Sequence, residues 1–211
     1  CNKASLPGSR LTTAQITGAS DVYNGNGGTD RFLIVNSANT TSTIDFSNVT
    51  NVEKAEVQLN SSGAVVIALG SVASTDSEPA TFEVDGSAVT SSTGTLSFNN
   101  GNTDESAMAT VFTLKGGVNG DTLAGGYQAD TITGNGGADV LRGNTGADTI
   151  TGGSGADTIL GGAGADNITS LGGVDSITGG TGNDTISAGD GADYIEGDAG
   201  ADNITTGAGA D

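Results

Sequence analysis

The sequence predicts an all-β protein in which residues 116–211, 96 of the 211 residues, form a β-solenoid. Three observations support this fold class. A nine-residue unit repeats from residue 116 to residue 211 without insertion or deletion, its sixth place is always Asp, and its eighth place is Leu or Ile in all ten full units. A unit with one aliphatic residue in nine cannot bury a helical stripe or an alternating strand face by itself. Neighbouring units must therefore stack to complete a common core.

The unit follows the pattern GGxGxDxUx, where U is the aliphatic residue, from Leu123 in the first unit to Ile204 in the tenth. Burying one such side chain stabilises the fold by about 1.5–3 kcal/mol, whereas ordering nine residues costs on the order of 13 kcal/mol. Another interaction must therefore stabilise the folded state, and the invariant carboxylates are the candidates. The sixth-place aspartates are Asp121, Asp130, Asp139, Asp148, Asp157, Asp166, Asp175, Asp184, Asp193, Asp202 and Asp211.

The spacing of the aspartates predicts calcium sites. If GGxGxD turns a corner and xUx forms a short strand, two units make one coil and each Asp stacks on the Asp 18 residues further on. Stacked strands lie about 4.8 Å apart, and calcium binds oxygen at about 2.3–2.6 Å, so an ion midway between two corners can reach both carboxylates. One column begins at Asp121 and the other at Asp130. They contain five and four adjacent pairs, which sets a ceiling of nine ions.

The glycines fit the same interpretation. They allow positive φ and bring backbone carbonyls close to an ion, and carbonyls supply the ligands that two carboxylates leave vacant. The segment 116–211 has a net charge of 13 negative, so we expect it to be disordered without calcium. The glycines that we predict as carbonyl ligands are Gly153, Gly155, Gly162, Gly164, Gly180 and Gly182.

With this pattern, residues 116–211 resemble the calcium-binding nonapeptide repeats of RTX (hemolysin-type) proteins. The resemblance implies a right-handed parallel β-roll, folding triggered by calcium after export, and type I secretion of the unfolded chain. Asn119 and Gln128 depart from the pattern because they replace the fourth-place glycine, and residues 170–171, Ala188 and Asp198 depart from it in the first two places. We expect weak or absent calcium binding in these units, above all in the first two.

The segment before the repeats is divided into residues 1–10, a terminal segment, residues 11–33, and residues 34–115. Residues 11–33 contain two degenerate copies of the unit, which place Asp21 and Asp30 nine residues apart and out of phase with the main array. This predicts a separate short coil, with Asp30 as a weak candidate calcium ligand. A coil held by hydrogen bonds alone explains the pattern equally well.

Residues 34–115 predict a β-rich spacer domain. Apolar residues alternate with polar ones, for example at 55–59 and 65–69, and Phe112 and Leu114 oppose Val111, Thr113 and Lys115, as in half-buried strands. The Asp-Gly pair at 85–86 predicts a tight hairpin turn. The phrase DFSNVTNVEKAEVQL resembles spacer segments of bacterial surface-layer proteins and large adhesins.

Composition excludes several classes of function. The chain has 25 acidic and 6 basic residues, which argues against nucleic acid as a partner. It has no His, so a HExxH zinc site and any Ser-His or Cys-His nucleophile are excluded within it, and we expect no enzymatic activity. No run reaches the length of a transmembrane segment or a signal peptide. Cys1 is interpreted as a fragment boundary rather than a lipidated residue, and the end in mid-repeat at Asp211 also predicts a fragment.

These observations predict a non-enzymatic, extracellular structural module of a bacterial surface-layer (S-layer) protein, which folds on calcium and assembles into a lattice on the cell surface. The expected partners are calcium, further copies of the chain and, as a further candidate, cell-surface polysaccharide. Two alternatives stay open. The segment 116–211 could be the calcium-folded tail of a secreted hydrolase, or part of an RTX adhesin that binds an external ligand.

Overall fold

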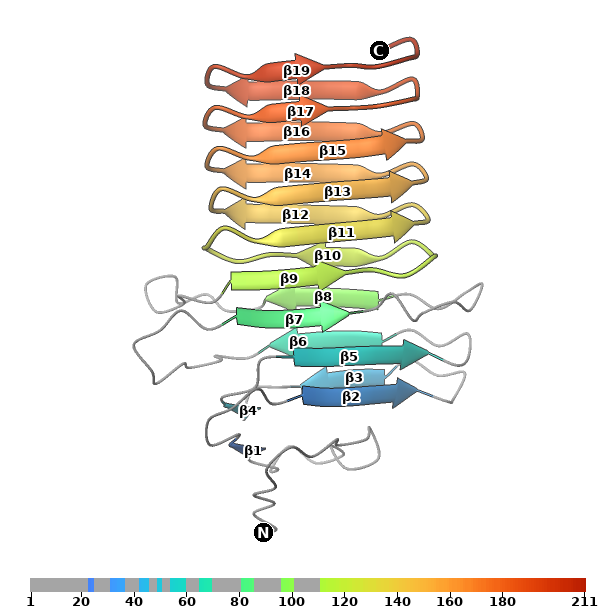
Figure 1. The fold of residues 1–211 in the computed structure, drawn as a ribbon, viewed down its shortest axis with the longest axis vertical. Coiled ribbons are helices and arrows are strands. Elements are labelled where there is room, and N and C mark those ends of the chain that lie inside the picture. Colours follow the sequence, from blue (N-terminus) through green and yellow to red (C-terminus); the bar gives the residue numbers. More distant parts are fainter. Residues whose placement is uncertain are drawn as a thin grey trace.

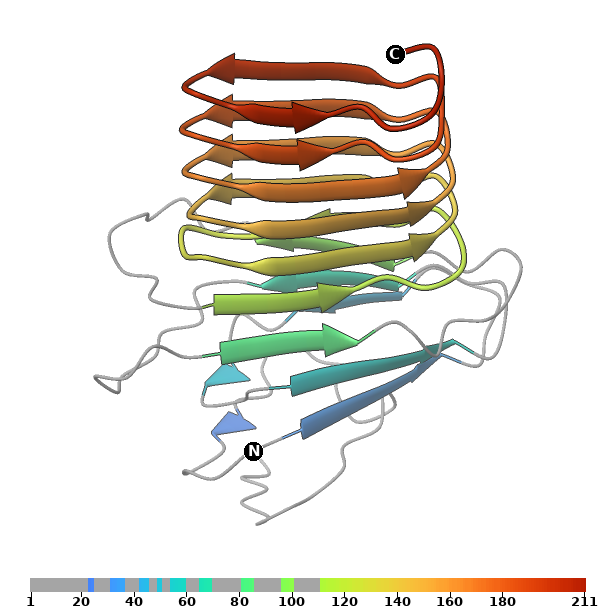
Figure 2. The same ribbon diagram turned by 45° about the horizontal axis from the view of Figure 1, so that its top comes forward.

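The computed structural model describes residues 111–211 throughout and, of residues 1–110, only the backbone of the strands β1–β8. The described residues contain strands and turns and no helix. Two sheets of parallel strands face each other, and from β5 onwards each successive strand lies in the other sheet, so that one coil contributes one strand to each (Figure 1). With the top of the molecule tilted forward, the coils are seen stacked and their corners line two opposite edges (Figure 2). The predicted all-β parallel solenoid is therefore confirmed.

The larger sheet has nine described strands, which lie in sequence order from one edge to the other. They are β2 (Arg31–Asn36), β5 (Lys54–Leu59), β7 (Thr81–Asp85), β9 (Val111–Lys115), β11 (Thr131–Gly136), β13 (Thr149–Ser154), β15 (Asn167–Gly172), β17 (Thr185–Ser187) and β19 (Asn203–Thr205).

The facing sheet has eight described strands in the same kind of order. They are β3 (Ser42–Asp45), β6 (Val65–Leu69), β8 (Leu96–Asn100), β10 (Thr122–Ala124), β12 (Val140–Thr145), β14 (Thr158–Ala163), β16 (Ser176–Thr181) and β18 (Tyr194–Ala199). A separate pair is formed by β1 (Tyr23–Asn24) and β4 (Val49–Thr50).

The register within the repeats is 18 residues, as two nine-residue units per coil require. Thr131 pairs with Thr149, and Thr149 pairs with Asn167. The earlier strands belong to the same two sheets but have longer coils, since Lys54 pairs with Glu83 across 29 residues. The boundary predicted between 115 and 116 falls inside this continuous stack, because β9 pairs with both β7 and β11.

The strands of the repeats are longer than the three residues predicted. Most of them have six residues, since they continue from the xUx part into the first three places of the next unit. Pairing resumes at the second place, as between Asn135 and Gly153 in β11 and β13. The corner therefore occupies only the fourth to sixth places, because the glycine-rich start of the unit still has a backbone partner in the coil on either side.

The hairpin predicted at residues 85–86 is wrong. Asp85 is the last residue of β7, which pairs in parallel with β5 and β9 on its two sides, and the next described strand, β8, lies in the facing sheet. A tight turn would need an antiparallel neighbour. In a parallel solenoid the neighbours of a strand are the preceding and following coils, so a local turn signal cannot set the pairing.

The core is a column of eighth-place side chains between the two sheets. The eight aliphatic residues from Leu123 to Ile186 are at most 1% exposed, and Phe112 and Leu114 of β9 are buried, as their alternation predicts. Ile204 is 41% exposed because β19 is an edge strand. In the part of the chain that the structure describes, no helix could span a membrane. Asp21 and Asp30 lie outside the described residues.

Candidate metal sites

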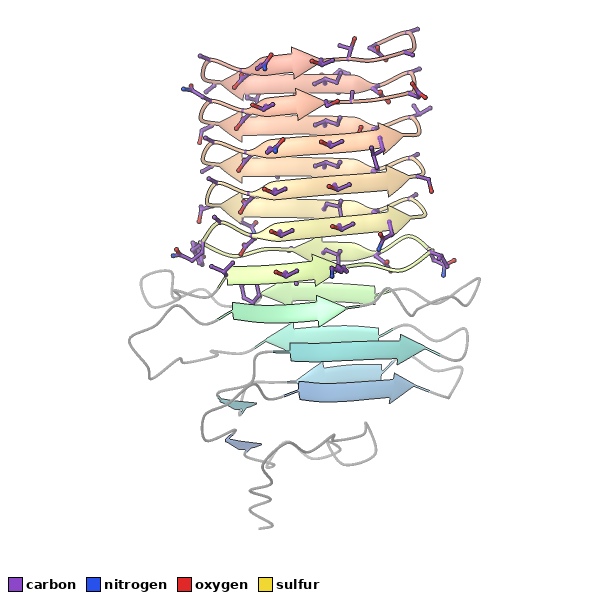
Figure 3. All side chains as sticks on the ribbon, in the orientation of Figure 1. Carbon is purple, nitrogen blue, oxygen red and sulfur yellow. The ribbon has the colours of Figure 1, made fainter. Side chains whose placement is uncertain are left out.

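The two predicted columns of aspartates are present, one along each edge of the stack. The backbone N–H of each of the nine repeat aspartates from Asp121 to Asp193 donates to Oδ1 of the Asp 18 residues further on, at 2.7–3.1 Å. Side chains follow the same regular stacking through the repeats (Figure 3). One column is Asp121, Asp139, Asp157, Asp175, Asp193 and Asp211, and the other is Asp130, Asp148, Asp166, Asp184 and Asp202.

The second carboxylate oxygen lacks a partner in most of these residues. Seven Oδ2 atoms among the described residues are buried and accept no hydrogen bond, and their side chains are at most 5% exposed. A buried carboxylate oxygen without a donor or a cation is strongly destabilising. These oxygens belong to Asp139, Asp148, Asp157, Asp166, Asp175, Asp184 and Asp193.

Five of the seven unpartnered oxygens lie against the first-place glycine of their own unit, whereas Ser170 and Ala188 stand at that place in the units of Asp175 and Asp193. A Cβ on Gly161 would be 2.5 Å from Oδ2 of Asp166 and 2.5 Å from the carbonyl oxygen of Gly179, one coil further on. No side chain fits there, because real Cβ contacts do not come closer than about 3.0 Å. The first-place glycine therefore allows the carboxylate of one coil and the carbonyl of the next coil to approach the same point.

The carbonyls of four predicted glycine ligands, Gly155, Gly162, Gly164 and Gly182, lie close to the backbone of the next coil. All six predicted glycines have positive φ, for example 117° at Gly162 and 140° at Gly164, a conformation that Gly adopts without strain. The carbonyl oxygen of Gly162 lies where a Cβ on Gly180 would be, and that of Gly164 lies where a Cβ on Gly182 would be. The gap between two stacked corners is thus lined by carboxylate and carbonyl oxygens.

Burial and repulsion between stacked carboxylates disfavour their charged form. Burial raises the pKa of Asp139 and of Asp148 from 3.8 to about 7, and neighbouring aspartates of the same column contribute to this rise. The pKa of Asp130 rises only to about 6, because a second backbone N–H, that of Gly126, also donates to its carboxylate. The corners therefore hold negative charge that the surrounding chain does not compensate.

The donor set fits calcium. In the part of the chain that the structure describes, no three Asp, Glu, His or Cys side chains converge on one point, so carboxylates meet in pairs and further ligands have to be main-chain carbonyls. Oxygen ligands in a flexible arrangement suit calcium, whereas zinc and copper prefer nitrogen and sulfur. The unpartnered Oδ2 atoms are where a cation would bind.

Comparison with known families gives the same result. Three segments, 115–150, 142–177 and 178–211, match the family described as RTX calcium-binding nonapeptide repeat (4 copies). Residues 115–211 form an RTX β-roll. RTX repeats bind calcium and occur in proteins exported by type I secretion. No curated protein and no solved structure gave a significant match to the chain.

The first two corners of the RTX β-roll have a different geometry. Oδ2 of Asp121 accepts a hydrogen bond from the N–H of Gly117, and Oδ2 of Asp130 accepts one from Gly126, both at 2.6 Å. Neither second-place glycine has positive φ, unlike the second-place residues of all later units. These are the units in which Asn119 and Gln128 replace the fourth-place glycine. Here the carboxylates are satisfied by the chain itself.

Two residues next to these corners were missed by the sequence analysis. The side-chain amide of Asn135 donates to the carbonyl of Gly116, and that of Asn144 donates to the carbonyl of Gly125, both at 2.8 Å. Both asparagines stand at the second place with φ of 77°. The signal was available, because second-place Asn occurs only in the two units that stack on the two units lacking a fourth-place glycine.

The other departures from the repeat leave the carboxylates unpartnered. Ser170 replaces a first-place glycine, is buried, and donates its hydroxyl to the carbonyl of Ala188. Leu171 has a φ of 79° at the second place, which is unusual for a bulky residue. Oδ2 of Asp175 in the same unit nevertheless has no hydrogen-bond partner.

Proposed function

We propose that this RTX β-roll binds seven calcium ions and that the coils holding them fold only when they are bound. The seven unpartnered Oδ2 atoms carry this proposal. Counting pairs of stacked aspartates gives the same number. Of the nine predicted pairs, the two that begin at the hydrogen-bonded corners of Asp121 and Asp130 are left out, and seven remain. The seven pairs are Asp139–Asp157, Asp157–Asp175, Asp175–Asp193, Asp193–Asp211, Asp148–Asp166, Asp166–Asp184 and Asp184–Asp202.

Bound calcium supplies positive charge between corners, and the chain supplies the oxygen ligands and the stacking that aligns them. The eighteen-residue register places each carboxylate over the next, and Oδ1 is fixed by the backbone N–H of the preceding coil, as between Asp157 and Asp139. In five of these units the first-place glycine leaves room for Oδ2 to lie close to the carbonyl of the next coil. Because these groups are aligned only when the coils are stacked, binding energy is also folding energy.

Calcium titration of the protein in chelator-treated buffer tests this proposal. Far-UV circular dichroism should change from a disordered to a β spectrum as calcium is added, and isothermal titration calorimetry should reach seven ions per chain. A chain that keeps its full β spectrum in excess chelator would contradict the proposal. Saturation at nine ions would contradict the count but not the dependence on calcium.

We further propose that the protein is a non-enzymatic, extracellular component of a bacterial surface layer, in which calcium stiffens each subunit and joins subunits into a lattice. The continuity of both sheets from β2 and β3 to β19 and β18 supports a rigid rod-like element, and the chain has no His for the common forms of nucleophilic or zinc catalysis. A net charge of 19 negative makes the subunits repel each other unless cations bridge them.

Electron microscopy of the purified protein tests the surface-layer proposal. Ordered sheets should appear when calcium is added and disperse when it is chelated. Soluble monomers at saturating calcium would argue against a lattice and favour the alternative of a calcium-folded module attached to a secreted hydrolase or adhesin.

A further inference from the structure

One RTX β-roll contains two kinds of corner. In seven corners the Oδ2 atom of the aspartate is buried without a partner. In the first two, those of Asp121 and Asp130, Oδ2 accepts a backbone N–H of the same unit. We call the first kind open corners and the second kind closed corners. The two closed corners lie next to each other in the sequence but on opposite edges of the stack, so together they complete one coil.

We propose that the closed coil is a calcium-independent base on which the calcium-dependent coils are built. This proposal rests on the calcium-dependent folding proposed above for the open corners. The physical reason is that a closed corner has no uncompensated buried oxygen, so it needs no cation to be stable. Folding without calcium should therefore reach the closed coil and stop there.

The contacts of Asp130 show how a closed corner is satisfied. Its Oδ1 accepts the N–H of Phe112 at 2.7 Å and its Oδ2 accepts the N–H of Gly126 at 2.6 Å. Asp148, directly above it, has only the first type of bond, from the N–H of Asp130 to Oδ1. Hydrogen bonds to a charged acceptor are among the stronger ones in proteins. They take the place of a cation at this corner.

The asparagines satisfy a second group in the closed coil. In both kinds of corner the first-place carbonyl of one coil faces the carboxylate of the preceding coil, as Gly179 faces Asp166 and Gly134 faces Asp121. The carbonyls of Gly116 and Gly125 have no Asp at the corresponding sequence position of the preceding coil, and they accept the amides of Asn135 and Asn144. The same arrangement occurs at both edges with the same 2.8 Å distance. Because Asn tolerates positive φ better than most residues, it provides this amide without loss of the local conformation.

The closed coil offers paired strand edges to the open coils. In a solenoid each coil is stabilised mainly by its neighbours, so adding a coil to an existing stack is easier than starting a new one. The base provides two strand edges, β10 and β11, for the first open strands, β12 and β13, to pair with.

Hydrogen–deuterium exchange of the full chain in excess chelator tests the base directly. Peptides from residues 116–130 should exchange at least about tenfold more slowly than peptides from residues 146–211. On addition of calcium, protection should appear in the later coils. Equal, fast exchange over the whole of 116–211 in chelator would overturn the proposal. The exchange in chelator does not depend on calcium binding, so its failure is distinct from a failure to bind calcium.

The double substitution Asn135→Gly and Asn144→Gly should remove the protection of residues 116–130 in chelator but leave protection intact at saturating calcium. Glycine keeps the positive φ and removes only the amide. Asn183→Gly is the matched control, because Asn183 also bonds a backbone group 18 residues away, at an open corner. The control should leave the base protected. Unchanged protection in the double variant would show that the asparagines do not maintain the base.

A second variant converts the closed corners into open ones. Adding Asn119→Gly and Gln128→Gly to the two substitutions above restores the glycine pattern of the later units. The number of calcium ions bound at saturation should rise from seven to nine, and protection in chelator should disappear. If this variant still binds seven ions, the side chains at these four places do not decide between closed and open corners, and the proposal is refuted.

Discussion

Replacing Asp148 with Asn should have opposite effects with and without calcium. Asp148 is 1% exposed, its Oδ1 accepts the N–H of Asp130 at 2.7 Å, and its Oδ2 has no partner. Burial raises its pKa from 3.8 to about 7, although the hydrogen bond from the backbone N–H of Asp130 acts to lower it. Above pH 7 the charged carboxylate therefore costs the calcium-free fold about 4 kcal/mol, since each pH unit corresponds to about 1.4 kcal/mol.

Asparagine has nearly the same shape without the charge. It keeps the acceptor for Asp130, and its NH2 group would face the carbonyl of Gly161, which lies near the present Oδ2 atom. Removing the charge removes its cost of about 4 kcal/mol, but burying the amide costs about 1–3 kcal/mol. Asp148→Asn should therefore stabilise the calcium-free fold by about 1–3 kcal/mol. At saturating calcium it should bind six ions instead of seven, because the pair with Asp166 loses a ligand.

The assay compares folding induced by an osmolyte in chelator with calcium binding. Trimethylamine N-oxide favours burial, so far-UV circular dichroism should show the variant folding at a lower osmolyte concentration than the unaltered protein. Calorimetry should show the loss of one ion. Asp190→Asn serves as the control, because Asp190 is exposed, and it should change neither quantity. If Asp148→Asn needs as much osmolyte as the unaltered protein, buried charge is not what opposes folding without calcium.

Three further predictions follow from the same geometry. Asp157→Ala removes a ligand from two stacked pairs, so calorimetry should show five ions and a far greater loss of affinity than for Asp190→Ala; equal losses would mean that the register is wrong. Ile159→Asp places a charge in the core, where Ile159 is 1% exposed, and should cost at least about 3 kcal/mol even at saturating calcium; an unchanged melting temperature would contradict this. In chelator, stability should fall as the pH rises from about 4 to about 7, because Asp139 has its pKa raised from 3.8 to about 7 and the folded state binds more protons in this window; circular dichroism showing equal disorder at about pH 5 and about pH 8 would count against it.

The sequence was sufficient to predict the part of the fold that the period determines. An eighteen-residue register follows from two units per coil, and it places Asp139 over Asp121 and Ile150 over Ile132. Neither result depends on local propensity. The unvaried spacing leaves no other stacking in which all aspartates reach the edges and all aliphatic residues reach the core. Which oxygens would remain unpartnered could not be predicted, because this depends on backbone φ at the second place.

The errors have a common physical cause. The strand length and the hairpin at residues 85–86 were both inferred from local signals, and in a solenoid the partner of a strand comes from the next coil. The second-place asparagines were overlooked for a related reason. Asn135 fits the positive φ of its own unit. Its second role is found only when that unit is stacked on the preceding coil, where its amide donates to the carbonyl of Gly116, 19 residues earlier.

The balance of charge gives an independent reason for seven ions rather than nine. Residues 116–211 contain fourteen acidic residues and one basic residue, Arg142, so their net charge is 13 negative. Seven calcium ions bring fourteen positive charges and leave the folded β-roll close to neutral, whereas nine would bring eighteen and leave it positively charged. Repulsion along the columns therefore opposes folding before calcium binds, and seven ions are enough to remove it. At the two closed corners, backbone N–H groups bind the Oδ2 atoms of Asp121 and Asp130 in place of an eighth and a ninth ion.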